Sequence, residues 1–224
     1  MEKSGSRRPA IITPTKVGRA LGGHLPPPGA KIGLLGGSFN PAHQGHLQIS
    51  LEALRRLGLD EVWWLVSPQN PLKPQNGMAP LSERVTKAQE LARHPKIRVT
   101  PLESLLNTQF TADTLRKLRK SLPKAHFVWL LGADNLYQLE KWHNWQQIFD
   151  ETVVAIFDRP SYALRALAGK AARTFASYRM DERSARRLAR SKPPAWVFLH
   201  TPLNPLSATQ IRSGQVRSGQ SQFL

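Results

Sequence analysis

Twelve residues near the start of the chain decide the fold: Gly36-Gly37-Ser38-Phe39-Asn40-Pro41-Ala42-His43-Gln44-Gly45-His46-Leu47. A short apolar run precedes them at 32–35, and leucines at helical spacing follow them, Leu47, Leu51, Leu54 and Leu57. The pattern predicts a strand, a glycine-rich turn and the start of a helix. Glycines allow the backbone to approach a ligand closely, and the unpaired N–H groups of a helix start favour phosphate. Because His43 and His46 are three residues apart, both imidazoles can point into one cavity.

Composition predicts one domain with a full core. The chain has 224 residues and 40% hydrophobic residues, which is ordinary for a globular protein. It contains no cysteine, so disulfides and thiolate metal sites are excluded. We find neither an apolar run long enough to cross a bilayer nor the apolar segment of a signal peptide, and we expect a cytoplasmic protein.

The net charge of +17 first suggests a nucleic-acid partner. However, the sequence has no RNA-recognition pattern, no zinc-finger spacing and no basic leucine zipper. The positive charge is also uneven, because residues 161–192 carry nine Lys or Arg and only two acids. A small anionic substrate would benefit from such a field as well, and a solvated basic surface explains most of the charges. We therefore do not expect nucleic acid to be the partner.

Residues 1–29 are basic and rich in proline and glycine, ending in Pro26-Pro27-Pro28-Gly29. This composition predicts a poorly ordered extension that forms no core, with a transit peptide as a minor alternative. Residues 30–224 are predicted to form a single domain.

Continuous apolar runs alternate with helical segments along that domain, which indicates a parallel sheet covered on both faces. The predicted fold is therefore α/β and Rossmann-like, a doubly wound, mostly parallel sheet of six strands. Residues 161–192 are predicted to form two helices. The strands are expected at 32–35, 61–66, 97–99, 127–131, 153–157 and 196–200.

Several polar residues follow predicted strands, where ligands bind in open α/β sheets. Lys73 lies in the proline-rich loop after the second strand and could reach a phosphate, although an exposed lysine is as good an account. Asp134 follows the fourth strand, where it could accept a hydrogen bond from a sugar hydroxyl or cap a helix. Trp142 could stack on a flat ring, although tryptophans are more often core residues.

A second phosphate site is predicted near the C-terminal end, where Leu206-Ser207-Ala208-Thr209-Gln210-Ile211-Arg212 follows two prolines and resembles a helix start. Free N–H groups, the hydroxyls of Ser207 and Thr209, and the guanidinium of Arg212 would bind an anion there. Taken alone, the serine and threonine indicate only a helix cap.

In this order, the motifs resemble those of bacterial nicotinate-nucleotide adenylyltransferases, which belong to the HxGH nucleotidyltransferase superfamily. The resemblance covers residues 31–214. The glycine-rich stretch and the C-terminal Ser-x-Thr-x-x-Arg are general to the superfamily, and three further matches narrow it to the pyridine-nucleotide branch. These are Phe110-Thr111-Ala112-Asp113-Thr114-Leu115, Gly132-Ala133-Asp134 with Trp142, and Arg159-Pro160.

The resemblance implies transfer of AMP from ATP to nicotinate mononucleotide, with magnesium held mainly by the triphosphate. It implies catalytic roles for His43, His46 and Arg212. The residues expected to bind ATP are Gly36, Gly37, Ser38, Phe39, His43, His46, Ser207, Thr209 and Arg212. Those expected to bind the mononucleotide are Lys73, Phe110, Thr111, Asp134, Trp142 and His143.

The residues themselves favour the same chemistry. Without a cysteine nucleophile, a Gly-x-Ser-x-Gly elbow or a metal-ligand cluster, the candidate site offers imidazoles, cations and backbone N–H groups, which suit phosphoryl-type transfer by direct in-line attack. Three departures from the family are a shorter loop before Lys73, Phe110 in place of tyrosine, and the added N-terminal tail. The alternatives are another transferase of the superfamily, such as phosphopantetheine adenylyltransferase, or a nucleic-acid-binding protein with an inactive site. The oligomeric state is left open, with a homo-oligomer compatible with the sequence.

Overall fold

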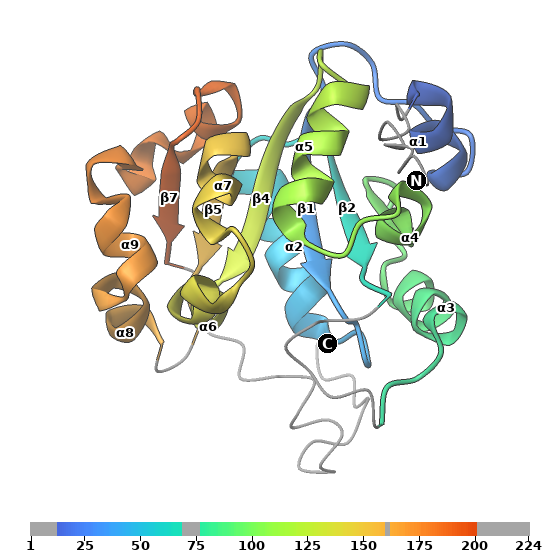
Figure 1. Ribbon diagram of the computed structural model, residues 1–224, viewed down its shortest axis with the longest axis horizontal. Coiled ribbons are helices and arrows are strands. Elements are labelled where there is room, and N and C mark those ends of the chain that lie inside the picture. The colour runs from blue at the N-terminus through green and yellow to red at the C-terminus, as the bar shows by residue number, and fades with distance from the viewer. Residues whose placement is uncertain (1–12, 69–76, 160–161, 201–224) are drawn as a thin grey trace, which may run out of the picture.

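The computed structural model describes residues 13–68, 77–159 and 162–200 (Figure 1). Its strands are β1 (Lys31–Gly37), β2 (Glu61–Val66), β3 (Ile97–Thr100), β4 (His126–Gly132), β5 (Val153–Phe157), β6 (Arg179–Met180) and β7 (Trp196–Leu199). Its α-helices are α1 (Pro14–Ala20), α2 (Gln44–Arg56), α3 (Leu81–Leu91), α4 (Leu102–Leu106), α5 (Thr111–Ser121), α6 (Ala133–Gln138), α7 (Trp145–Glu151), α8 (Ala163–Ala168) and α9 (Lys170–Thr174). Three 3-10 helices complete the elements, η1 (Leu139–Lys141), η2 (Ala176–Tyr178) and η3 (Glu182–Arg190).

Within the described residues, one sheet contains seven strands in the order β3-β2-β1-β4-β5-β7-β6, and every neighbouring pair is parallel. The predicted doubly wound α/β class is confirmed. The predicted number of six strands is wrong by one, because β6 has only two residues and shows no apolar run. The chain order reverses between β1 and β4, and ligands in such sheets bind at the carboxyl ends of the strands beside that reversal.

Both faces of the sheet are covered, as the continuous apolar runs predicted. Successive side chains of a strand point to opposite faces, so Trp63 belongs to the core under α4–α9 and Trp64 to the core under α2, α3 and η3. Both rings are fully buried. In Figure 1, α5 and α7 lie in front of the sheet and α2 lies behind it. None of the helices in the described ranges is long and apolar enough to cross a membrane.

The part of the N-terminal extension that the structure describes does not match the prediction of a segment without core contacts. Residues 14–20 form α1, and Val17 and Leu21 are buried against the core that α4 and α5 share. The hydroxyl of Thr100 donates to the carbonyl of Ala20 at 2.8 Å, which ties α1 to the end of β3. Pro14 stands at the start of α1, where its fixed φ favours a helix. A helix of seven residues is too short to show a clear hydrophobic period in a sequence rich in glycine and proline.

Three local predictions also need correction. Residues 161–192 are predicted to form two helices, but their described part is divided among five elements, α8, α9, η2, β6 and η3. The sequence favours Ser82 as the cap of a helix that begins near Leu81, but the cap residue of α3 is Pro80. Leu51 is 41% exposed, because the buried face of α2 is formed by smaller residues such as Ser50 and Ala53.

Candidate functional site at the carboxyl ends of β1 and β4

The turn between β1 and α2 lies at the carboxyl end of a central strand, as predicted. Phe39 adopts a φ of 45°, an uncommon conformation for a side chain with a Cβ. Its ring is buried between two others, at 5.1 Å from Trp64 and 4.6 Å from His46 between ring centroids. The ring of Phe39 therefore packs in the core under the turn, and only the backbone of Phe39 is available to line a ligand.

His43 and His46 meet at the start of α2, where His43 is the N-terminal cap. Their ring centroids lie 3.9 Å apart, and the His43 N–H donates to Nδ1 of His46 at 3.2 Å. Because Nδ1 of His46 accepts this bond, the proton of its neutral ring lies on Nε2. The N–H of the neutral His46 ring therefore lies on the side away from the His43 backbone.

His43 is held in its neutral form. Its side chain is buried, and among the described residues its Nδ1 has no hydrogen-bond partner. Burial, assisted by the positive charge of Arg159, lowers the pKa of His43 to about 4. A neutral imidazole at a helix start can donate its one N–H to an arriving anion.

The two glycines of the turn differ in what surrounds them. A Cβ at Gly36 would overlap the ring of Trp129, so this glycine lets β1 pack against a buried tryptophan of β4. A Cβ at Gly37 would make only ordinary contacts, the nearest being 3.4 Å from the ring of Phe39. The packing role of Gly36 is a structural reason for glycine that the sequence could not separate from ligand approach.

Arg84 of α3 fixes the turn from within. Its side chain is buried, and its guanidinium donates to four backbone carbonyls and to no carboxylate among the described residues. The acceptors are the carbonyl oxygens of Ala79 at 2.9 Å, Ser38 at 2.6 Å, Ser67 at 2.7 Å and Pro68 at 3.0 Å. Arg84 thus joins the β1–α2 turn to the loop that leaves β2. Sequence reasoning missed it, because an arginine at a helix start carries no sign of distant backbone acceptors.

Asp134 lies in the first turn of α6, where its carboxylate Oδ1 is 3.3 Å from Nε of Arg159. The alternative role of helix cap is not observed, because Gly132 is the cap residue of α6. A Cβ at Gly132 would lie 2.5 Å from Oδ1 of Asp134 and 3.0 Å from Nε of Arg159, so glycine leaves room for the pair. Arg159 follows β5 and links Asp134 to His43 electrostatically. The sequence marked Arg159 only as a family motif.

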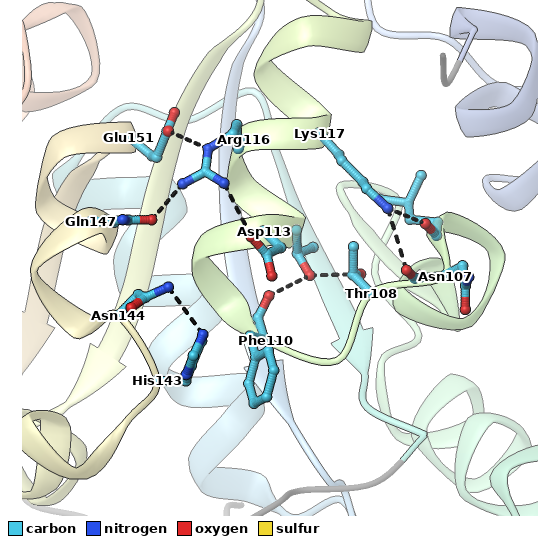
Figure 2. A network of polar contacts seen from close by, with 12 residues as sticks. Asn107, Thr108, Phe110, Asp113, Arg116, Lys117, His143, Asn144, Gln147 and Glu151 are labelled. Carbon is cyan, nitrogen blue, oxygen red and sulfur yellow. Dashed lines mark hydrogen bonds and ion pairs between the residues drawn. The ribbon is translucent and has the colours of Figure 1, made fainter. Parts of the chain in front are cut away.

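Phe110 and His143 form an aromatic pair beside this edge (Figure 2). Phe110 caps α5, and its ring lies 4.2 Å from that of His143 between centroids. Asn144 is 3.0 Å from Nε2 of His143 through its side-chain amide. Trp142 is half-buried and packs partly against the core, and its stacking on a ligand ring stays a prediction. Thr111 begins α5, directly after Phe110.

Four predicted site residues, Lys73, Ser207, Thr209 and Arg212, lie outside the described residues. The second phosphate site therefore stays a prediction. The described candidates fall into two groups, the histidine turn after β1 and the polar and aromatic groups around the starts of α5 and α6.

Comparison with known proteins gives matches over most of the chain. The model of the cytidylyltransferase-like family matches residues 34–214. A probable nicotinate-nucleotide adenylyltransferase of Cereibacter sphaeroides is 50% identical over 190 residues, 85% of this chain and 98% of the relative. A probable nicotinate-nucleotide adenylyltransferase of Brucella abortus is 46% identical over the same shares. The Plasmodium falciparum nicotinic acid mononucleotide adenylyltransferase complexed with NaAD has a TM-score of 0.62 at 18% identity, covering 82% of this chain and 83% of that one, and supports the fold.

Proposed function

Because the chain belongs to the nicotinate-nucleotide adenylyltransferase family, we propose that it transfers the adenylyl group of ATP to nicotinate mononucleotide. The products are deamido-NAD and pyrophosphate. The observation that carries this proposal is the pair of imidazoles at the start of α2, 3.9 Å apart between centroids, beside the point where the strand order reverses. The reaction belongs to NAD biosynthesis, and we place it in the cytoplasm.

The chemistry is a direct displacement. A phosphate oxygen of the mononucleotide attacks the α-phosphorus of ATP, and the bond from that phosphorus to the bridging oxygen of the β-phosphate breaks. Pyrophosphate leaves with the electron pair of this bond. Nε2–H of His46 stabilises the charge that develops on the leaving group, and the N–H groups at the start of α2 hold the phosphates. No covalent intermediate on the protein is needed.

Magnesium enters as part of the MgATP substrate in this proposal. Among the described residues, no three His, Asp or Glu side chains lie together as a metal site. Magnesium prefers phosphate oxygens and water to an all-protein cage. Such an ion would neutralise part of the triphosphate charge, while His43, His46 and Arg159 supply the remaining polar contacts.

The acceptor would lie between the starts of α5 and α6. Thr111 is the first residue of α5 and follows Phe110 of the Phe110–His143 pair, so a flat pyridine ring could stack on this pair while its carboxylate binds the helix start. Asp134 is suited to a ribose hydroxyl and Trp142 to the ring. Lys73, Ser207, Thr209 and Arg212 keep their predicted roles toward the phosphates.

Pyrophosphate release distinguishes this function from its alternatives. The purified protein with MgATP is offered nicotinate mononucleotide, nicotinamide mononucleotide or phosphopantetheine in separate reactions. We expect release with nicotinate mononucleotide, and phosphopantetheine should behave like a reaction without acceptor. Release with phosphopantetheine alone would assign the chain to another branch of the superfamily. Release with none of the three would refute adenylyl transfer to these acceptors.

A further inference from the structure

Glu103 is a buried carboxyl that the proposed reaction does not use. It lies on α4, is 6% exposed, and forms hydrogen bonds with the hydroxyls of Ser67 and Thr114. Ser67 follows β2, and Thr114 lies in the first turn of α5. Glu103 therefore connects the loop after β2 with the helix start that is proposed to hold the acceptor.

No cation forms an ion pair with Glu103 among the described residues. The main elements packed against α4 are α1, β2 and α5. The ammonium group of Lys117 on α5 donates hydrogen bonds to the carbonyls of Leu106 and Asn107 (Figure 2). The charged groups on the three elements are Lys16, Arg19, Glu61, Asp113, Arg116, Lys117, Arg119 and Lys120. Burial alone raises the pKa of Glu103 to about 7, against two hydroxyl bonds that favour ionisation.

The protonation state of Glu103 decides which group receives the single hydroxyl proton of Thr114. The hydroxyl of Thr114 is placed to donate to Thr108 Oγ1 at 2.8 Å and to the carbonyl of Phe110 at 3.2 Å, but it has one proton. A protonated Glu103 can donate to Thr114, which leaves that proton for Thr108 or Phe110. An ionised Glu103 can only accept, so it would draw the Thr114 proton away from the cap of α5.

A negative charge on Glu103 would also weaken the binding of an anion at the start of α5. The start of a helix is positive and attracts carboxylates, and a negative charge one turn along that helix opposes this attraction. We propose that Glu103 is a positioning and specificity residue, whose neutral carboxyl secures the start of α5 and adds no negative charge of its own beside it, so that a pyridine bearing a carboxylate is preferred. This inference rests on the proposed function.

The preference for nicotinate over nicotinamide mononucleotide tests the proposal. The two ligands share the 5′-phosphate and differ in the carboxylate, so the ratio of their dissociation constants cancels the titration of the phosphate. We measure both constants by calorimetry between pH 5.5 and 8.5 for the unchanged protein, Glu103→Gln, and Glu140→Gln as an exposed control. We expect the ratio, the dissociation constant of nicotinamide mononucleotide divided by that of nicotinate mononucleotide, to fall several-fold with rising pH in the unchanged protein and in the control. In Glu103→Gln, whose amide can still donate to Thr114 and accept from Ser67, it stays near the acid value.

Two results would overturn the proposal: a ratio independent of pH in the unchanged protein, or the same pH dependence in Glu103→Gln. Infrared difference spectra between pH 6 and pH 8.5 give a readout that does not depend on binding. The carbonyl band of a protonated carboxyl should be lost on raising the pH, and Glu103→Gln should lack this change. Failure of the proposed function is separate, because it would appear as no pyrophosphate release with either mononucleotide.

Discussion

His46→Ala is expected to lower turnover about 100-fold or more while the protein remains folded. Removing a donor that is positioned toward the charge of the transition state raises the activation free energy by about 3–4 kcal/mol in a site of this kind. Steady-state pyrophosphate release with saturating MgATP and nicotinate mononucleotide measures the effect. His126→Ala is the control, because His126 is exposed at the first residue of β4, the opposite end of the sheet from the candidate site.

Two further substitutions separate catalysis by His46 from its structural role. Asparagine can place an acceptor near the position of Nδ1 and so keep the bond from the His43 N–H, whereas glutamine can place a donor near Nε2. We expect His46→Asn to be nearly as inactive as the alanine variant and His46→Gln to regain part of the turnover. Nearly full activity in His46→Asn would show that the residue acts as a cap and not as a donor.

Arg84→Met is expected to destabilise the protein by about 3 kcal/mol or more. The substitution removes four hydrogen bonds from a charged group to buried or half-buried carbonyls, and each unsatisfied group costs about 1–3 kcal/mol. Part of this cost is recovered where water reaches the loops. The midpoint of urea unfolding measures the change. Arg98→Met provides a control of equal size, because Arg98 pairs with Glu61 in a half-exposed position where about 1 kcal/mol or less is expected.

The same variant tests whether Arg84 also holds the histidine turn in place. Through the carbonyl of Ser38 it fixes the backbone before His43, so its loss should raise the KM for ATP about 10-fold or more. Arg84→Lys keeps the charge but cannot span the four acceptors, and it should recover only a small part of this loss. Recovery of the full ATP affinity by lysine would mean that charge alone matters.

The main strands were predictable because their apolar runs are continuous and long. The predicted bounds agree with those of β2 and β5. Short elements gave no comparable signal: β6 has two residues, and α1 buries one face among glycines and prolines. Their positions depend on packing against distant segments, which a local pattern does not report.

The candidate site was predictable where a motif concentrates chemistry in a few residues. The spacing of His43 and His46 placed both rings correctly at a helix start. The supporting residues were not predictable, because Arg84 acts through backbone carbonyls of other segments and Glu103 through hydroxyls far away in sequence. Arg159 became a site residue only when the parallel sheet brought the end of β5 beside β4 and placed it against Asp134.

The most direct test of the account follows the ring signals of the histidines by NMR as pH changes, with and without a non-hydrolysable ATP analogue and magnesium. In the free protein, burial and Arg159 hold the pKa of His43 at about 4. A bound triphosphate favours the imidazolium, so this pKa should rise to about 5 or higher, with proton uptake on binding and tighter binding as the pH falls through the raised pKa toward 4. This rise is expected for His43 at saturating analogue. An unchanged His43 at saturating analogue would contradict the claim that the two imidazoles hold the phosphates.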